Sequence, residues 1–268
     1  MRVAGRRVLI TGASRGLGAA LARGFRRRGA RLALVARSAE PLAAVADEVG
    51  GVAYPWDVSA IHTLPELVER VEADGPVDVL VNNAGVSNVG WFLDRTPEEI
   101  DQVVTVNLLA PMHLCRQLLP RMVERGAGHV VNMSSMSAVF APPGLAAYGA
   151  TKAGLSHFTE GLRADLRDQP ITFTTVHLGS VRTEMDDEAR SYGPLRQLAE
   201  RSGGRDITPM AVFVAAVLRA VESDREEVRV PWMMAPLAVV AHAPRRIGRL
   251  VFRRAVVMEP RSDAPRGR

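Results

Sequence analysis

The sequence of 268 residues has one cysteine and no long apolar run. Cys115 has no second cysteine with which to form an internal disulfide, and a single thiol is too little for a metal cluster, so we expect no metal site. A lack of disulfides is typical of a reducing compartment, which predicts a cytoplasmic protein. No stretch of about 18 apolar residues exists, so the sequence predicts no membrane-spanning helix.

Aromatic residues are also scarce, at 5% of the chain. Proteins that bind single-stranded nucleic acid combine positive charge with aromatic side chains for base stacking, so we expect no nucleic-acid partner. Apolar residues make up 47% and charged residues 24%, a globular balance that excludes a disordered chain. The length suits one large α/β domain better than two small ones.

The positive charge of the chain is concentrated near its end. The net charge is +5, yet residues 244–268 alone carry eight arginines against two acidic residues. We therefore divide the chain into a domain over residues 1–243 and a basic tail over residues 244–268. If the tail forms a helix, its apolar side chains can line one side and its basic side chains another. The apolar ones are Ile247, Leu250 and Val251, and the basic ones are Arg246, Arg249 and Arg253. Such a tail suits peripheral contact with an anionic membrane, and the alternative is a segment packed over a cleft or subunit seam.

Predicted strands alternate with predicted helices along the chain. Strands are predicted at residues 7–11, 30–37, 51–56, 77–85, 128–135, 171–179 and 226–231. Helices are predicted at residues 17–29, 38–50, 64–73, 97–125, 148–168 and 209–221. The polar stretch at 184–208 predicts a mobile flap. Four strands are continuous apolar runs, which is typical of a parallel sheet with both faces covered.

This order of elements predicts an α/β fold. Right-handed crossovers then give a single-domain, Rossmann-type, doubly wound parallel sheet of about seven strands with helices on both faces. Ligands of such sheets bind at the carboxyl ends of the strands, so we look there for functional residues.

The turn between the first strand and the first helix is rich in glycine. Gly12, Gly16 and Gly18 stand in the run TGASRGLG. Glycine in such a turn lets a diphosphate approach the backbone, and the N-terminus of the following helix meets its charge. The alternative is a tight turn that glycine only allows to pack closely.

The second predicted strand lacks the acidic residue that would bind the ribose of NAD. No Asp or Glu occurs between Arg31 and Ala39. Arg37 instead follows that strand, and Arg15 lies in the glycine turn, so both guanidinium groups can bind a 2′-phosphate. The alternative is that both are solvated surface arginines. We therefore expect NADP(H) as the cofactor, with NAD(H) the less favoured one.

Tyr148 and Lys152 begin a predicted helix one turn apart. Lys152 is the only lysine in the chain, although 34 residues are basic. An ammonium beside a phenol favours the phenolate and would lower the pKa of Tyr148 towards the range of a useful acid or base. Ser135 ends the fifth strand and can hold a substrate oxygen beside the phenol, with Ser134 as the competing candidate.

Motifs across about 175 residues together resemble the short-chain dehydrogenase/reductase family. They are TGASRGLG at 11–18, DV at 57–58, NNAG at 82–85, Asn107 in VNLLAP, Ser135 in NMSSMS, YGATK at 148–152 and LGSVRTEM at 178–185. The resemblance implies that Tyr148 is the acid/base and that Lys152 tunes it and holds the nicotinamide ribose. It also implies that Ser135 steadies the substrate oxygen, and that Asn107, at a helix irregularity, keeps a water linking Lys152 to solvent.

The resemblance also implies a dinucleotide site within the 1–243 domain. Its residues, besides Tyr148 and Lys152, would be Gly12, Ser14, Arg15, Gly16, Leu17, Gly18, Arg37, Asp57, Val58, Asn83, Ala84, Gly85, Gly179, Val181 and Thr183. Asp57 and Val58 are expected at the adenine, and residues 83–85 along the adenosine. Val181 and Thr183 are expected at the carboxamide and diphosphate. The family usually has Pro-Gly after the sixth strand, where this chain has Leu178-Gly179.

These features predict an NADP(H)-dependent oxidoreductase that transfers a hydride between nicotinamide and a carbonyl or secondary alcohol. The apolar tail and the flap together suggest an apolar small-molecule substrate. The resemblance implies a homodimer or homotetramer. The alternatives are a non-catalytic NADPH-binding regulator, which would tend to lose the tyrosine or lysine, and a membrane-peripheral protein on the same fold.

Overall fold

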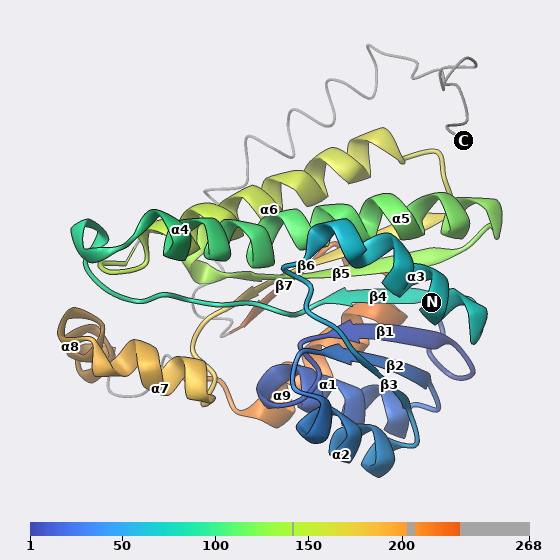
Figure 1. The fold of residues 1–268 in the computed structure, drawn as a ribbon, viewed down its shortest axis with the longest axis horizontal. Coiled ribbons are helices and arrows are strands. Elements are labelled where there is room, and N and C mark those ends of the chain that lie inside the picture. Colours follow the sequence, from blue (N-terminus) through green and yellow to red (C-terminus); the bar gives the residue numbers. More distant parts are fainter. Residues whose placement is uncertain (141, 203–206, 231–268) are drawn as a thin grey trace.

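A computed structural model describes residues 1–140, 142–202 and 207–230 of the chain (Figure 1). The basic tail at 244–268 and the last part of the predicted 1–243 domain lie outside these residues. Contact of the tail with a membrane therefore stays a prediction. Within the described residues, no helix has both the length and the apolar character needed to cross a membrane.

The described strands form one parallel sheet in the order β3-β2-β1-β4-β5-β6-β7. They are β1 (Arg7–Thr11), β2 (Arg31–Ala36), β3 (Val52–Pro55), β4 (Val79–Asn82), β5 (Gly128–Ser135), β6 (Ile171–Leu178) and β7 (Glu227–Val230). The order reverses between β1 and β4, and such a switch point leaves a crevice at the carboxyl ends of the strands. The predicted doubly wound sheet is confirmed.

Helices cover both faces of this sheet. They are α1 (Gly16–Arg27), α2 (Ala39–Val49), α3 (Leu64–Ala73), α4 (Pro97–Val104), α5 (Ala110–Glu124), α6 (Ala146–Asp165), α7 (Glu184–Ser191), α8 (Gly193–Ser202) and α9 (Met210–Glu222). Figure 1 shows α1, α2 and α9 on one side of the sheet and α3, α4, α5 and α6 on the other.

Alternate residues of the strands point into two separate cores. Ile10 packs in one core with Phe25 of α1 and Phe213 of α9. Leu9, its neighbour in β1, packs in the other core with Leu114 of α5. All five residues of β1 are buried, and its three central residues are apolar, as expected of a strand in a parallel sheet covered on both sides.

In its described part, the predicted flap at 184–208 forms two helices, α7 and α8, and its mobility stays a prediction. Thr183 caps α7 by accepting a hydrogen bond from the backbone N–H of Asp186 at 3.3 Å. Pro194 is the second residue of α8, where its missing N–H breaks no helical hydrogen bond. A polar stretch without a helix prediction therefore still forms two short helices.

Candidate active site

The carboxyl ends of the central strands border a cavity of about 550 Å³. Its wall includes Leu17 after the glycine turn, Gly85 after β4, Ser135 at the end of β5, and Tyr148 and Lys152 on α6. Residues of α7 and α8 supply a further wall. The predicted cofactor turn and the predicted catalytic residues therefore border one continuous space.

Lys152 is a buried ammonium on the first turns of α6. Its Nζ donates a hydrogen bond to the backbone oxygen of Met133 at 2.9 Å and lies 5.5 Å from the centre of the Tyr148 ring. Burial lowers the pKa of Lys152 to about 8. An ammonium has three donors, so donors remain for hydroxyl groups of a bound sugar. A methyl group on Gly85 would lie 3.6 Å from Nζ, so this glycine lies directly beside the ammonium.

The pKa of Tyr148 differs from the sequence-based prediction. Burial raises it above its ordinary value of 10, and a hydrogen bond with Ser135 lowers it by less. The causes of this raised pKa do not include Lys152, whose Nζ lies 5.5 Å from the centre of the ring, so the lowering by the ammonium stays a prediction. In this state Tyr148 is a protonated phenol at neutral pH, which suits a proton donor.

The two candidate serines have different surroundings. The hydroxyl of Ser134 is 2.7 Å from that of Ser156 and donates to the backbone oxygen of Lys152 at 3.1 Å. It thus ties β5 to α6. Ser135 lines the cavity, and its Oγ accepts a hydrogen bond from the backbone N–H of Ser137 at 3.1 Å. The geometry favours Ser135 as the residue that meets a substrate oxygen.

Asn107 lies in a π-helical turn, Thr105–Leu109, that joins α4 to α5. Its side chain accepts from the backbone N–H of Val86 at 2.9 Å and donates to the backbone oxygen of Val86 at 2.8 Å. It also donates to Thr151 Oγ1 on α6 at 3.2 Å. Asn107 therefore holds the loop after β4 against the helix that carries Tyr148 and Lys152. The continuous helix predicted at 97–125 is interrupted here.

The glycine turn has a backbone conformation and close contacts that residues with side chains could not adopt. Gly12 and Gly16 have φ values of +65° and +55°, in the left-handed region that favours glycine. A methyl group on Gly18 would lie 2.1 Å from the carbonyl oxygen of Gly12. No side chain caps the start of α1, so its first N–H groups are available to an anion. This cradle fits a dinucleotide diphosphate.

The loop after β4 is tied to the glycine turn. The backbone N–H groups of Asn83 and Ala84 both donate to Thr11 Oγ1 at 3.0 Å, and the amide of Asn83 donates to the backbone oxygen of Thr11 at 2.8 Å. Ser14 lies half-buried in the same turn. The predicted adenosine wall and the predicted diphosphate turn are thus one connected unit.

The remaining predicted adenine residues follow β3. One oxygen of Asp57 accepts from the backbone N–H and the hydroxyl of Ser59, at 2.9 and 2.8 Å. Val58 is buried. Asp57 therefore shapes a turn at the carboxyl edge of the sheet, next to the end of β2.

The two predicted phosphate-binding arginines are both exposed. Arg15 pairs with Glu184 at the start of α7, with 2.6 Å between Nη1 and Oε2. Within the described part of the chain, Arg37 makes no ion pair. A 2′-phosphate near Arg37 would therefore meet an unengaged guanidinium, whereas Arg15 would have to exchange its carboxylate partner.

The loop after β6 is held in place although it lacks the proline usual in the family. The backbone N–H of Gly179 donates to the oxygen of Val230 at 2.7 Å. Val181 is buried. A methyl group added to Gly16 would lie 3.6 Å from the Cγ2 atom of Thr183. Thr183 therefore faces the glycine turn, as expected of a residue near the diphosphate.

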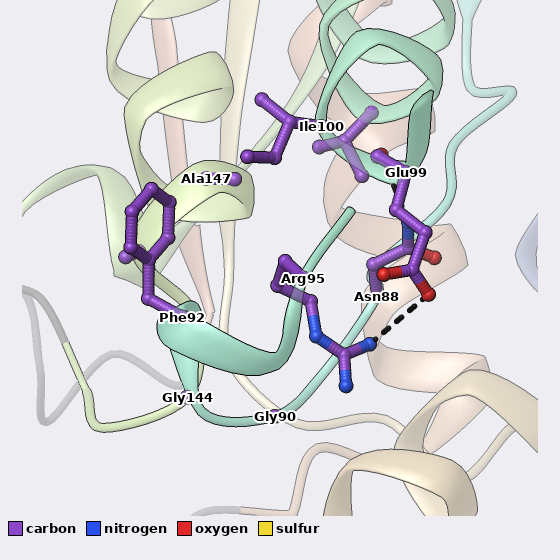
Figure 2. Close-up of a pocket in the computed structure, with 10 residues that line it drawn as sticks. Asn88, Gly90, Phe92, Arg95, Glu99, Ile100, Gly144 and Ala147 are labelled. Atoms are coloured by element: carbon purple, nitrogen blue, oxygen red, sulfur yellow. Dashed lines mark hydrogen bonds and ion pairs between the residues drawn. The ribbon is translucent and has the colours of Figure 1, made fainter. Parts of the chain in front are cut away.

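A separate small hollow lies between the loop after β4, helix α4 and the start of α6 (Figure 2). Its volume is about 10 Å³, the space of one water molecule, so it is too small for a substrate. Asn88 there donates from its amide to the backbone oxygen of Glu99 at 2.9 Å, and Arg95 pairs with Glu99 at 3.3 Å. These contacts anchor the loop after β4 onto α4.

Sequence reasoning missed residues that support or border the site. Thr151 and Ser156 contact Asn107 and Ser134 from α6, and a signal for Ser156 was its place one helical turn after Lys152. Ser87 and Ser137 also line the cavity. No sequence pattern distinguished them from other loop serines.

The profile of the short chain dehydrogenase family matches residues 6–192. The chain is 38% identical to the ketoacyl reductase HetN of Nostoc sp. over 231 residues, which covers 84% of this chain and 78% of that protein. It is 36% identical to the oxidoreductase UcpA of Salmonella typhimurium over 201 residues, covering 72% and 76% of the two chains.

Solved structures agree with this assignment. A short-chain dehydrogenase from Streptomyces avermitilis superposes with a TM-score of 0.77 at 29% identity, covering 92% of this chain and 96% of that one. A metagenomic short-chain oxidoreductase in complex with NADP gives 0.68 at 34% identity, covering 85% and 98%. The chain belongs to the short-chain dehydrogenase/reductase family and is an oxidoreductase that acts on alcohol or carbonyl substrates with a nicotinamide cofactor.

Proposed function

We propose that the protein is an NADP(H)-dependent carbonyl reductase in which Tyr148 donates the proton. The observation that carries this proposal is the arrangement of α6, which places a protonated phenol and a buried ammonium on the wall of the cavity that Ser135 also lines. The turn that fits a diphosphate borders the same cavity.

The cofactor, when bound, would supply the hydride to the carbonyl carbon. Ser135 and Tyr148 hold the carbonyl oxygen by hydrogen bonds, and Tyr148 passes its proton to that oxygen as negative charge develops on it. Lys152, charged below a pKa of about 8, holds the ribose and favours the phenolate that remains. Alcohol oxidation uses the same residues in reverse.

The preference for NADP(H) rests on Arg37 and on the absence of an acidic residue after β2. The ribose hydroxyl of NAD would find no carboxylate between Arg31 and Ala39. One solved relative supports the preference, since the metagenomic short-chain oxidoreductase is a complex with NADP. The name of the ketoacyl reductase relative supports the reductive direction.

A screen of NADPH consumption by the purified protein tests the proposal. The compounds are aldehydes, ketones, steroids and acyl thioesters, with NADH as the matched control cofactor. We expect consumption of NADPH with at least one class of ketone and slower consumption of NADH. Consumption of NADH at the same efficiency would contradict the cofactor preference, and no consumption with any carbonyl compound would contradict the reductase function.

A further inference from the structure

Three consecutive apolar side chains are exposed between β4 and α4. Trp91, Phe92 and Leu93 are 61%, 50% and 74% exposed. Single apolar residues are common on protein surfaces, but a contiguous group of large ones marks a surface that another segment or molecule covers. We call these three residues the apolar turn.

The apolar turn is held in place by the chain around it. The backbone N–H of Gly90 donates to the backbone oxygen of Gly144 at 3.0 Å. Phe92 lines the small hollow together with Ala147 of α6 (Figure 2). The exposed side chains therefore belong to a fixed part of the surface, and a binding segment meets them without first having to order the loop.

Acidic side chains follow the apolar turn directly. Asp94, Glu98 and Asp101 are exposed, and among the described residues they form no ion pair. Arg95 pairs with Glu99 at 3.3 Å, so these two residues add no net charge. The surface is thus apolar with an acidic border. Such a border repels the headgroups of anionic lipids and attracts a cationic segment.

The basic tail has the complementary composition. Residues 245–254 hold five arginines and no acidic residue. Ile247, Leu250 and Val251 stand among these arginines. A segment that is both apolar and basic matches a surface that is both apolar and acidic.

The tail also starts close enough to reach the apolar turn. Asn82 of β4 and Glu227 of β7 lie in one row across the sheet, linked through their partners in β5 and β6. Three strand spacings separate these two residues, about 15 Å, and the chain from Asn82 to Trp91 adds at most about 32 Å. The chain from Glu227 to Arg245 can extend to about 60 Å, which exceeds the sum of the two distances.

We propose that residues 245–254 dock on the apolar turn of the same chain. Their apolar side chains cover Trp91, Phe92 and Leu93, and their arginines face the acidic border. The contact does not depend on the proposed function, because none of the described residues that form it lines the catalytic cavity.

Disulfide trapping in the full chain tests this docking. Cys115, the only cysteine of the chain, is buried, so engineered cysteines react without a background. Leu93→Cys is combined with Leu250→Cys. In the matched control, Val212→Cys replaces Leu93→Cys, since Val212 is 53% exposed on α9, on the other side of the sheet (Figure 1). Under mild oxidation, we expect the first pair to form a disulfide within one chain at least tenfold faster than the control pair.

Charge variants test the acidic border. Asp94→Lys together with Asp101→Lys should slow trapping of the first pair by about threefold to tenfold, because the arginines then meet like charges. This double variant leaves the capping residues of α4 unchanged, and thermal melts check that it folds. Raising the salt concentration to about 0.5 M should also slow trapping, since salt screens exposed charges.

Three outcomes would overturn the docking. Equal trapping rates for the Leu93 and Val212 pairs would show that the tail has no preferred contact with the apolar turn. A disulfide that forms only between two chains, seen as a covalent dimer, would assign the apolar turn to the tail of a partner subunit. Sedimentation with phosphatidylserine vesicles that abolishes trapping of the Leu93 pair would assign the tail to a membrane.

Discussion

Lys152 is the site residue whose buried charge lowers the stability of the folded protein. Its ammonium is buried, and burial alone lowers its pKa to about 8 from a usual value of 10.5. Because the folded-state pKa lies below the unfolded one, the unfolded chain binds the proton more tightly, and the charge destabilises the fold wherever both states are protonated. A buried charge kept at such a cost is typical of a functional site.

We expect Lys152→Met to stabilise the protein at pH 7 and to abolish turnover. The shift of the pKa corresponds to about 3 kcal/mol, and loss of the hydrogen bond to Met133 offsets about 1 kcal/mol, which leaves about 2 kcal/mol. Urea denaturation of both proteins measures the difference. It should shrink as the pH rises from 8 to 10.5, because the wild type then folds with a neutral amine. A variant less stable than wild type at pH 7 would contradict this account.

Arg37 is the residue on which cofactor preference depends. We expect Arg37→Ala to weaken NADPH binding by roughly tenfold to a hundredfold, the effect of a lost charge-assisted hydrogen bond, and to weaken NADH binding far less. Titration of nucleotide fluorescence gives both Kd values. Arg31→Ala, an exposed arginine at the other end of β2, serves as the matched control. Equal losses for the two cofactors would refute the phosphate role.

At the scale of elements, the sequence predicted those helix ends that depend on neighbouring residues alone. The helix predicted to begin at residue 97 does begin there as α4, and a capping box precedes it, with Thr96 Oγ1 accepting from the N–H of Glu99. The π-helical turn at Asn107 was not predictable from periodicity, because its side chain bonds a loop twenty-one residues away in sequence. Helices α7 and α8 were missed although Met185 and Ala189, and Leu195 and Ala199, are spaced by four residues, because both helices are short and mostly polar.

We expect Thr96→Ala to destabilise the protein by about 1 kcal/mol, because the cap at the start of α4 is lost. Thermal denaturation measures the loss, and Thr96→Ser, which keeps the hydroxyl, should restore most of it. If Thr96→Ala melts at the wild-type temperature, the capping box does not stabilise α4.

At the scale of the whole molecule, the sequence predicted the sheet and where ligands bind, because parallel strands must end at one edge. It could not pair Arg15 with Glu184, since that contact depends on how α7 lies over that edge. Nor could the motif alone give the pKa of Tyr148, which is raised by burial and lowered by less through the hydrogen bond with Ser135.

The family resemblance predicts a homodimer or homotetramer paired through the long helices α5 and α6, which lie on the same side of the sheet (Figure 1). Light scattering coupled to gel filtration should give two or four times the chain mass. A monomer at micromolar concentration would contradict the prediction.

The most direct test of the central claim is turnover by Tyr148→Phe, which removes one hydroxyl and keeps the ring. With a ketone that the wild type reduces, we expect kcat to fall at least a hundredfold, because no proton donor then meets the developing oxyanion. The Kd of NADPH should stay within about twofold of wild type, since the ring still packs beside Lys152. Tyr148→Phe turnover at the wild-type rate would contradict the account.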